Sequence, residues 1–103
     1  MDFAGFDWDE GNLGKRQKHG VSLAEIETMF AGTVLIAPDP ARSVREERFK
    51  AIGAGAEGRR LFVVFTLRTR EAKTFLRPVS ARYMHRREIK AYEEETSSPN
   101  HGR

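Results

Sequence analysis

The sequence contains no cysteine among its 103 residues. This excludes a disulfide framework and a thiolate metal site, and it is compatible with a reducing cytosol. Long apolar runs are also missing, since the longest stretch, Leu61–Phe65, is far too short to span a bilayer. The first residues are acidic and apolar, which is not the pattern of a secretory signal. We therefore expect a cytoplasmic protein.

The motifs of several enzyme classes are absent as well. Gly53–Gly58 has the G-x-G-x-x-G spacing, but it stands between two expected strands and not before a helix, whose N-terminus a dinucleotide site requires. The pairs Asp7/Asp9 and Glu46/Glu47 are better explained by helix capping and a solvated strand end. No HExxH or similar ligand spacing connects the three histidines, which are His19, His85 and His101. We expect neither a metal site nor a cofactor.

Positive charge is present and unevenly distributed. Residues 1–31 carry six acidic and three basic side chains, a local charge of −3, whereas residues 32–103 carry fifteen basic and nine acidic side chains, a local charge of +6. The asymmetry favours a polyanionic partner for the C-terminal two thirds. A solvated basic surface without a partner is the alternative that charge alone leaves open.

The N-terminal third predicts a short strand followed by two helices. Phe3, Phe6 and Trp8 are typical of a strand, and a helix is expected over about residues 9–18, with Gly20 as its left-handed cap. Ser22 and Glu25 have the spacing of a capping box at the start of a second helix. The apolar stripe of that helix should face the core before Gly32 ends it, and it comprises Leu23, Ile26, Met29 and Phe30.

The remaining chain predicts an antiparallel meander and a final helix. Strands are expected over residues 33–37, 46–54, 61–67 and 74–79, and Pro78 indicates an edge strand or an interrupted ladder. The run 61–67 is apolar on both faces, as in a central strand. Ser80 is expected to cap a helix that runs to about Glu94. We thus predict one α+β domain over residues 1–95 and a polar, disordered tail over 96–103.

The strongest chemical signal is cationic. Arg48 and Lys50 lie on one expected strand and Arg77 on another, while Arg82 and Arg86 are four apart on the expected last helix and would share one helical face. Arginine presents a planar fork of donors that suits phosphate. Many of these side chains could instead pair with neighbouring glutamates. For the arginines at positions 48, 77 and 82 we favour phosphate binding, because strand positions and a helix start can converge.

Several segments, taken in order, resemble BrnT toxins over roughly residues 3–94. The most specific are the K-H-G-V-S piece, followed by the V-S-A-R piece and an arginine-rich helix. The chain departs from the family pattern at Pro78, where an aliphatic residue is usual. The segments that carry the resemblance are Phe6–Asp9, Lys18–Ser22, Glu47–Gly53, Gly58–Thr66 and Arg77–Arg82.

The resemblance implies a type II toxin–antitoxin module. The expected fold is RelE-like α+β, an antiparallel sheet with two N-terminal helices and one C-terminal helix. The expected activity is RNA cleavage that arrests translation and growth. The expected partner is a BrnA-type antitoxin with a ribbon-helix-helix part, two toxins binding two antitoxins, and the complex would bind and repress its own operator DNA.

Cleavage of RNA without a metal can use the 2′-hydroxyl as nucleophile, and it then needs a base, an acid and cations at phosphorus. His19 is the candidate acid or base, since its ordinary pKa lies near neutrality, although it could equally pack at a helix end. The candidates for holding the scissile phosphate are Arg48, Arg77 and Arg82. Flanking RNA contacts are expected from Lys50, Ser80, His85 and Arg86, with His85 as a second acid or base.

Two other functions fit the same residues. A nucleic-acid- or ribosome-binding module without chemistry would use the same basic strand and helix. A pure interaction protein would dock its basic helix on an acidic segment of an antitoxin. Product formation separates the enzyme from both, whereas the salt dependence of binding does not, because it reports phosphate neutralisation alone.

Overall fold

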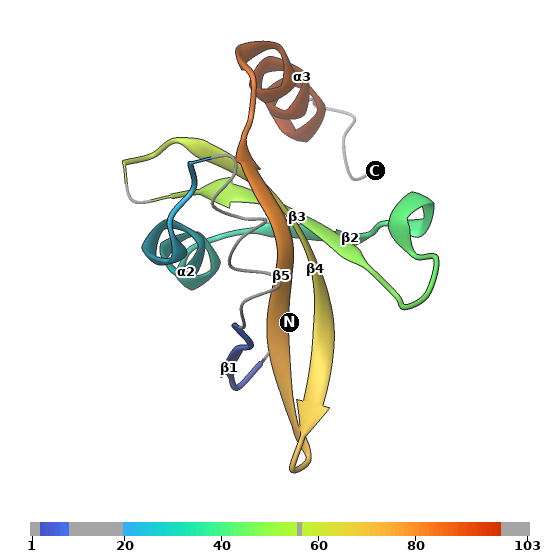
Figure 1. Cartoon of the computed structure of the whole chain (residues 1–103). Helices are drawn as coiled ribbons and strands as arrows, with labels where there is room; N and C mark the ends of the chain where they lie inside the picture. Colours follow the sequence, from blue (N-terminus) through green and yellow to red (C-terminus); the bar gives the residue numbers. More distant parts are fainter. Residues whose placement is uncertain (1–2, 9–19, 56, 98–103) are drawn as a thin grey trace.

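The computed structural model describes residues 3–8, 20–55 and 57–97, which form a five-stranded mixed sheet with helices at one face and one end (Figure 1). The strand order is β1-β5-β4-β3-β2. The strands are β1 (Gly5–Phe6), β2 (Leu35–Pro38), β3 (Phe49–Ala54), β4 (Arg60–Arg70) and β5 (Lys73–Tyr83). The helices are α2 (Leu23–Ala31), the 3-10 turn η1 (Pro40–Arg42) and α3 (Arg86–Ser97).

Helix α2 forms where the sequence predicts it. The Ser22 hydroxyl accepts a hydrogen bond from the Glu25 backbone N–H at 3.1 Å, and Gly32 ends the helix by donating its N–H to the Met29 carbonyl. Ile26 and Met29 are fully buried against the sheet. The predicted stripe is therefore the face that anchors α2 to the core, so α2 covers one face of the sheet.

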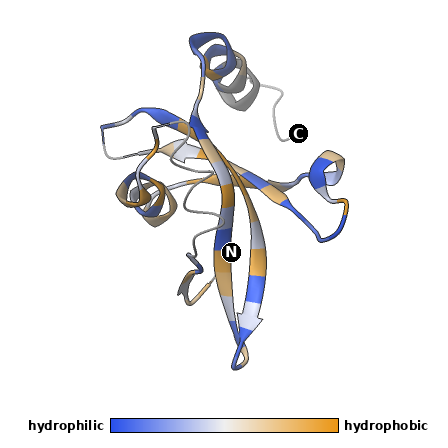
Figure 2. Ribbon diagram, viewed as in Figure 1, coloured by the Kyte–Doolittle hydropathy of each residue, from blue (hydrophilic) through white to orange (hydrophobic). Residues whose placement is uncertain are grey.

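The long β4–β5 hairpin is the centre of the molecule. Its core face carries Leu61, Val63 and Phe65 of β4, all fully buried, and Phe65 packs edge-on against Phe30 of α2. Hydrophilic and hydrophobic residues alternate along β5, as expected for a strand with two different faces (Figure 2). Beside β5, the short β1 pairs in parallel with Phe75 and Leu76.

The sheet differs from the prediction in one respect. It is mixed and not purely antiparallel, because β1 runs parallel to β5. Among the described residues the N-terminal side holds one helix, α2; the helix expected over 9–18 lies outside the described residues. The left-handed backbone predicted for Gly20 is present, with φ of +74°.

The largest error concerns the end of the sheet. Ser80 does not cap a helix, and Arg82 does not begin one, because β5 continues to Tyr83 and α3 starts only at Arg86. Arg82 and Arg86 therefore do not share a helical face. The reason is cross-strand pairing: after an irregularity opposite Pro78, at Val64/Phe65, the ladder with β4 resumes and extends to the end of the strand. Of the two alternatives predicted from Pro78, the interrupted ladder is confirmed and the edge strand is wrong, because β5 lies between β1 and β4.

Both hairpin turns contain residues with positive φ. Gly58 closes the β3–β4 connection with φ of +77°, a conformation that glycine adopts without strain. The β4–β5 turn places Glu71 and Ala72 at φ of +52° and +66°, the two-residue geometry that Asn-Gly favours. The connection left between the strands predicted over 61–67 and 74–79 is thus reduced to two residues, and both strands extend into it.

Helix α3 stands at the end of β5, away from the sheet (Figure 1). Two polar pairs connect it to the strands: Glu88 pairs with Arg82, and Glu93 lies 3.7 Å from Arg60. It ends at Ser97, past the Glu94 predicted from the sequence. None of the described helices combines the length and the apolar character that a membrane crossing requires.

Candidate nucleic-acid interface

The pairing register assigns the side chains of the sheet to two faces. Residues opposite one another on paired strands share a face, and successive residues alternate. Val63 pairs with Ala51 and Ala81, and these three buried residues lie on the core face under α2. Phe62, Val64, Thr66 and Arg68 of β4 and their partners therefore lie on the opposite face, which we call the open face.

An aromatic ring with two guanidinium groups near it marks one end of the open face. Phe62 pairs with Arg82 of β5 and with Ile52 of β3. The Arg82 Cζ lies 4.8 Å from the centre of the Phe62 ring, and the Arg42 Cζ lies 5.9 Å from it. Arg42 is held in turn by the buried Asp39 carboxylate, at 2.7 Å. Side chains from β4, β5 and η1 thus meet at this point.

The middle of the open face is formed by Val64 and Thr66 with their cross-strand neighbours. Val64 is flanked by Lys50 of β3 and Ser80 of β5, so a hydroxyl and an ammonium group lie on either side of a buried valine. The next residue on this face, Thr66, pairs with Arg77 and donates its hydroxyl to the Glu47 carbonyl at 2.9 Å. Lys50 is exposed, whereas Arg77 is half-buried.

A carboxylate stands among the arginines at the far end of this face. Arg68 donates to Glu46 at 2.6 Å, and this hydrogen bond is the main reason that the pKa of Glu46 lies below its ordinary value. The charges of Arg48 and Arg77 lower the pKa further. Arg48 precedes β3 and lies near enough to Glu46 for its charge to act on that carboxyl, which places it at this end of the open face. Glu46 is therefore surrounded by three arginines.

The Arg82 guanidinium binds a second carboxylate. The two oxygens of Glu88, in α3, each accept a hydrogen bond from Arg82 at 2.8 Å, a bidentate arrangement. Glu88 also accepts the backbone N–H of His85 at 2.9 Å. The Arg82 bonds, followed by the His85 bond, lower the pKa of Glu88 to about 2. The pair is partly exposed, with side-chain exposures of 36% and 37%.

The structure brings five of the eight predicted site residues to one face. They are Arg48, Lys50, Arg77, Ser80 and Arg82. His85 and Arg86 do not lie on the sheet; they are exposed at the start of α3, beside the Arg82–Glu88 pair. His19 lies outside the described residues. We refer to Arg48, Lys50, Arg68, Arg77 and Arg82 together as the cationic row.

Sequence reasoning missed three members of this surface. Arg68 was assigned to a turn and Glu46 to a solvated strand end, while Phe62 was counted only as part of a buried strand. The available signal was the alternation of β4, which places Phe62 and Arg68 on the same face. Arg77 also has a partner that the sequence did not indicate, the buried carboxylate of Asp7 at 3.6 Å.

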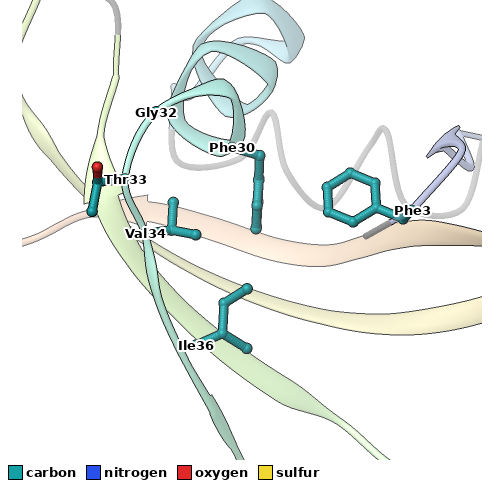
Figure 3. Close-up of a pocket in the computed structure, with 6 residues that line it drawn as sticks. All are labelled: Phe3, Phe30, Gly32, Thr33, Val34 and Ile36. Carbon is teal, nitrogen blue, oxygen red and sulfur yellow. The ribbon is translucent and has the colours of Figure 1, made fainter. Parts of the chain in front are cut away.

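Two further observations on the described residues concern ligands other than phosphate. A groove of about 530 Å³ lies beside α2 and carries no charged side chain (Figure 3). Its lining residues are Phe3, Phe30, Gly32, Thr33, Val34 and Ile36. Ile36 pairs with Ala51, so the groove lies on the core side of the sheet. Within the described parts of the chain, no group of three or more acidic, histidine or cysteine side chains is arranged to hold a metal ion.

Comparison with known proteins shows the family of the chain. A family model described as the ribonuclease toxin BrnT of type II toxin–antitoxin systems matches residues 8–88. The match spans α2, β2–β5 and the start of α3, and it contains every residue of the cationic row. No curated protein matches the chain. The chain belongs to the BrnT family, the ribonuclease toxins of type II toxin–antitoxin systems, which implies an RNA target and an antitoxin partner.

Proposed function

We propose that the open face binds single-stranded RNA and cleaves it without a metal ion. The observation that carries this proposal is the cationic row, which lies on the face opposite α2. A row of arginines and a lysine along one sheet face can follow the phosphates of an extended strand. The long arginine side chains of the row present planar donor forks suited to phosphate oxygens.

The reaction that fits this surface is an internal transesterification. The 2′-oxygen of one nucleotide attacks the adjacent phosphorus and loses its proton to a base. The bond from phosphorus to the 5′-oxygen of the next nucleotide breaks, and that oxygen gains a proton from an acid. The products are a 2′,3′-cyclic phosphate and a 5′-hydroxyl. Negative charge grows on the phosphoryl oxygens in the transition state, and positioned cations stabilise it.

We place the scissile phosphate over Val64, between Lys50 and Ser80. Arg77 and Arg82 lie on either side of this point along β5, so their guanidinium groups can approach one phosphate from both directions. Arg48 approaches from the neighbouring strand. Ser80 can donate its hydroxyl, and Lys50 can hold a flanking phosphate.

Three side chains are candidates for proton transfer. His19 and His85 are candidates because the imidazole group of histidine can act as an acid or a base at physiological pH. Glu46 is ionised at that pH and lies among the arginines that would contact the substrate. The Arg68 hydrogen bond lowers the pKa of Glu46 and so weakens it as a base. A substrate phosphate that draws Arg68 away would restore its basicity.

The cellular consequence would be inhibition of translation and arrest of growth. We further propose a RelE-like relationship for the fold. The antitoxin would be of the BrnA type, with a ribbon-helix-helix part that binds operator DNA in a complex of two toxins and two antitoxins. Covering the cationic row with an acidic segment would be sufficient to block RNA.

Expression in a bacterial host tests the biological part of this proposal. The chain is induced alone and together with its neighbouring gene, and growth is followed with the integrity of total RNA. Growth arrest with RNA cleavage, both reversed by the neighbour, supports the toxin function. Normal growth with intact RNA from folded protein would instead indicate a binding module without chemistry.

Cleavage by the purified protein tests the chemistry. RNA should be cut in the presence of a chelator, the products should carry a 2′,3′-cyclic phosphate and a 5′-hydroxyl, and substrate with a 2′-deoxy nucleotide at the cut site should resist. Cleavage that requires an added metal ion, or that proceeds at a 2′-deoxy site, would refute the mechanism.

A further inference from the structure

The Phe62 end of the open face has features that phosphate binding alone does not require. The ring belongs to the part of β4 that is apolar on both faces, residues 61–65, yet α2 covers only the core face. Phe62 is half-buried beside the guanidinium groups of Arg82 and Arg42. An aromatic side chain among arginine planes on an extended sheet is an arrangement that stacks nucleobases.

The same arginine already holds an anion. Arg82 lies against the Phe62 ring and grips both carboxylate oxygens of Glu88 at 2.8 Å. A guanidinium fork recognises a phosphate by the same two parallel hydrogen bonds as a carboxylate. Glu88 therefore shows where two anionic oxygens bind next to the ring. It comes from α3, which also places Glu93 at 3.7 Å from Arg60.

We propose that Phe62, Arg42 and Arg82 form a subsite for one nucleotide of single-stranded RNA, whose base stacks on Phe62 and whose phosphate replaces the Glu88 carboxylate on Arg82. The proposal rests on the proposed function, because it assumes that RNA binds the open face. With Glu88 displaced, Arg82 needs another anion in its place, and the aromatic ring favours one that carries bases over an acidic peptide.

Binding of RNA that cannot be cleaved tests the subsite apart from the chemistry. We would use a 2′-O-methyl oligonucleotide and a series in which each base in turn is removed. Phe62→Leu keeps an apolar side chain of similar size but removes the ring, and Phe62→Tyr keeps the ring. Loss of one stacked base should weaken binding roughly 5- to 150-fold. The wild type should show this loss at one position of the series.

The decisive result is whether the losses of affinity caused by Phe62→Leu and by removal of the base are non-additive. Phe62→Leu should bind the intact oligonucleotide as weakly as the wild type binds the sensitive abasic one, and it should be indifferent to that abasic position. Phe62→Tyr should behave as the wild type. Uniform weakening of Phe62→Leu across the whole series would overturn the subsite. If Phe62→Leu fails to fold, Phe62→Trp in a Trp8→Phe background replaces it, and its fluorescence must be quenched by RNA for the proposal to stand.

Glu88 gives an independent test on the phosphate side. Glu88→Gln removes the competing charge, so RNA should bind more tightly, while Glu93→Gln, the matched change elsewhere on α3, should leave affinity nearly unchanged. Equal affinities of both variants and the wild type would contradict the exchange of carboxylate for phosphate. Wild-type protein that binds an acidic peptide at Phe62 but no RNA would refute both this subsite and the proposed function; RNA binding that ignores Phe62 would refute the subsite alone.

Discussion

Replacing Arg82 by alanine should lower the rate of RNA cleavage strongly, whereas the free energy of unfolding should fall only modestly. The side chain makes a partly exposed ion pair with Glu88 and a contact with the Phe62 ring. Pairs of this kind contribute about 0.2–1 kcal/mol, and an exposed cation–π contact about 0.5–1 kcal/mol. The free energy of unfolding should therefore fall by about 1–2 kcal/mol, which lowers the Tm by roughly 4–15 °C in a domain of this size.

The expected effect on cleavage is larger because Arg82 would face charge that develops in the transition state. Removing one such donor lowers the rate by about 10²–10³-fold. Single-turnover cleavage of an RNA oligonucleotide, well below the Tm of the variant, measures this loss. Lys73→Ala, at the exposed end of the β4–β5 hairpin, makes the same change in net charge and should retain activity.

Salt dependence adds a second readout for the same variant. Loss of one phosphate contact should reduce the slope of log affinity against log salt by about 0.7 for single-stranded RNA. Arg82→Ala protein that is folded, cleaves at the wild-type rate and keeps the wild-type slope would refute the assignment of Arg82 to the interface.

Three further predictions follow from other parts of the structure. Glu46→Gln should reduce single-turnover cleavage if Glu46 accepts the 2′-hydroxyl proton, whereas Glu47→Gln, at an exposed neighbour, should not; equal rates for both would exclude Glu46. Because the pKa of Glu88 is lowered from 4.5 to about 2, the stability it adds is complete above pH 4.5 and is lost as the pH falls toward 2. The difference in Tm between the wild type and Glu88→Gln should therefore narrow over that range, and a constant difference would contradict the ion pair. Ala72→Gly should raise the Tm, because φ of +66° strains alanine, and unchanged or lower stability would contradict that strain.

Some of the fold is determined locally and could be predicted from the sequence. Helix α2 carries its own start signal at Ser22, its stop at Gly32 and an apolar stripe in between, so its position does not depend on distant residues. The central strand β4 is also visible as an apolar run, and the cationic residues that matter were recognisable by type. These features depend on side-chain chemistry and on the spacing of apolar residues along the chain.

The end of β5 depended on tertiary structure. Residues 80–83 lie in the strand because β4 offers them partners, and this pairing outweighs the helix-start signal at Ser80. The parallel position of β1 likewise follows from its contact with β5, which is distant in sequence. Local patterns contain no information on such partners.

The sequence by itself determined the family and the α+β fold class, and most of the cationic residues proposed for the site could be predicted from it. Only the tertiary structure decided which of them meet. Sheet register places Lys50, Arg77 and Arg82 on one face, because pairing between strands brings together residues that are up to 32 positions apart. The same pairing puts Arg82 beside Phe62. The physical reason is that a sheet face is assembled from separate strands, and its composition follows from their alignment.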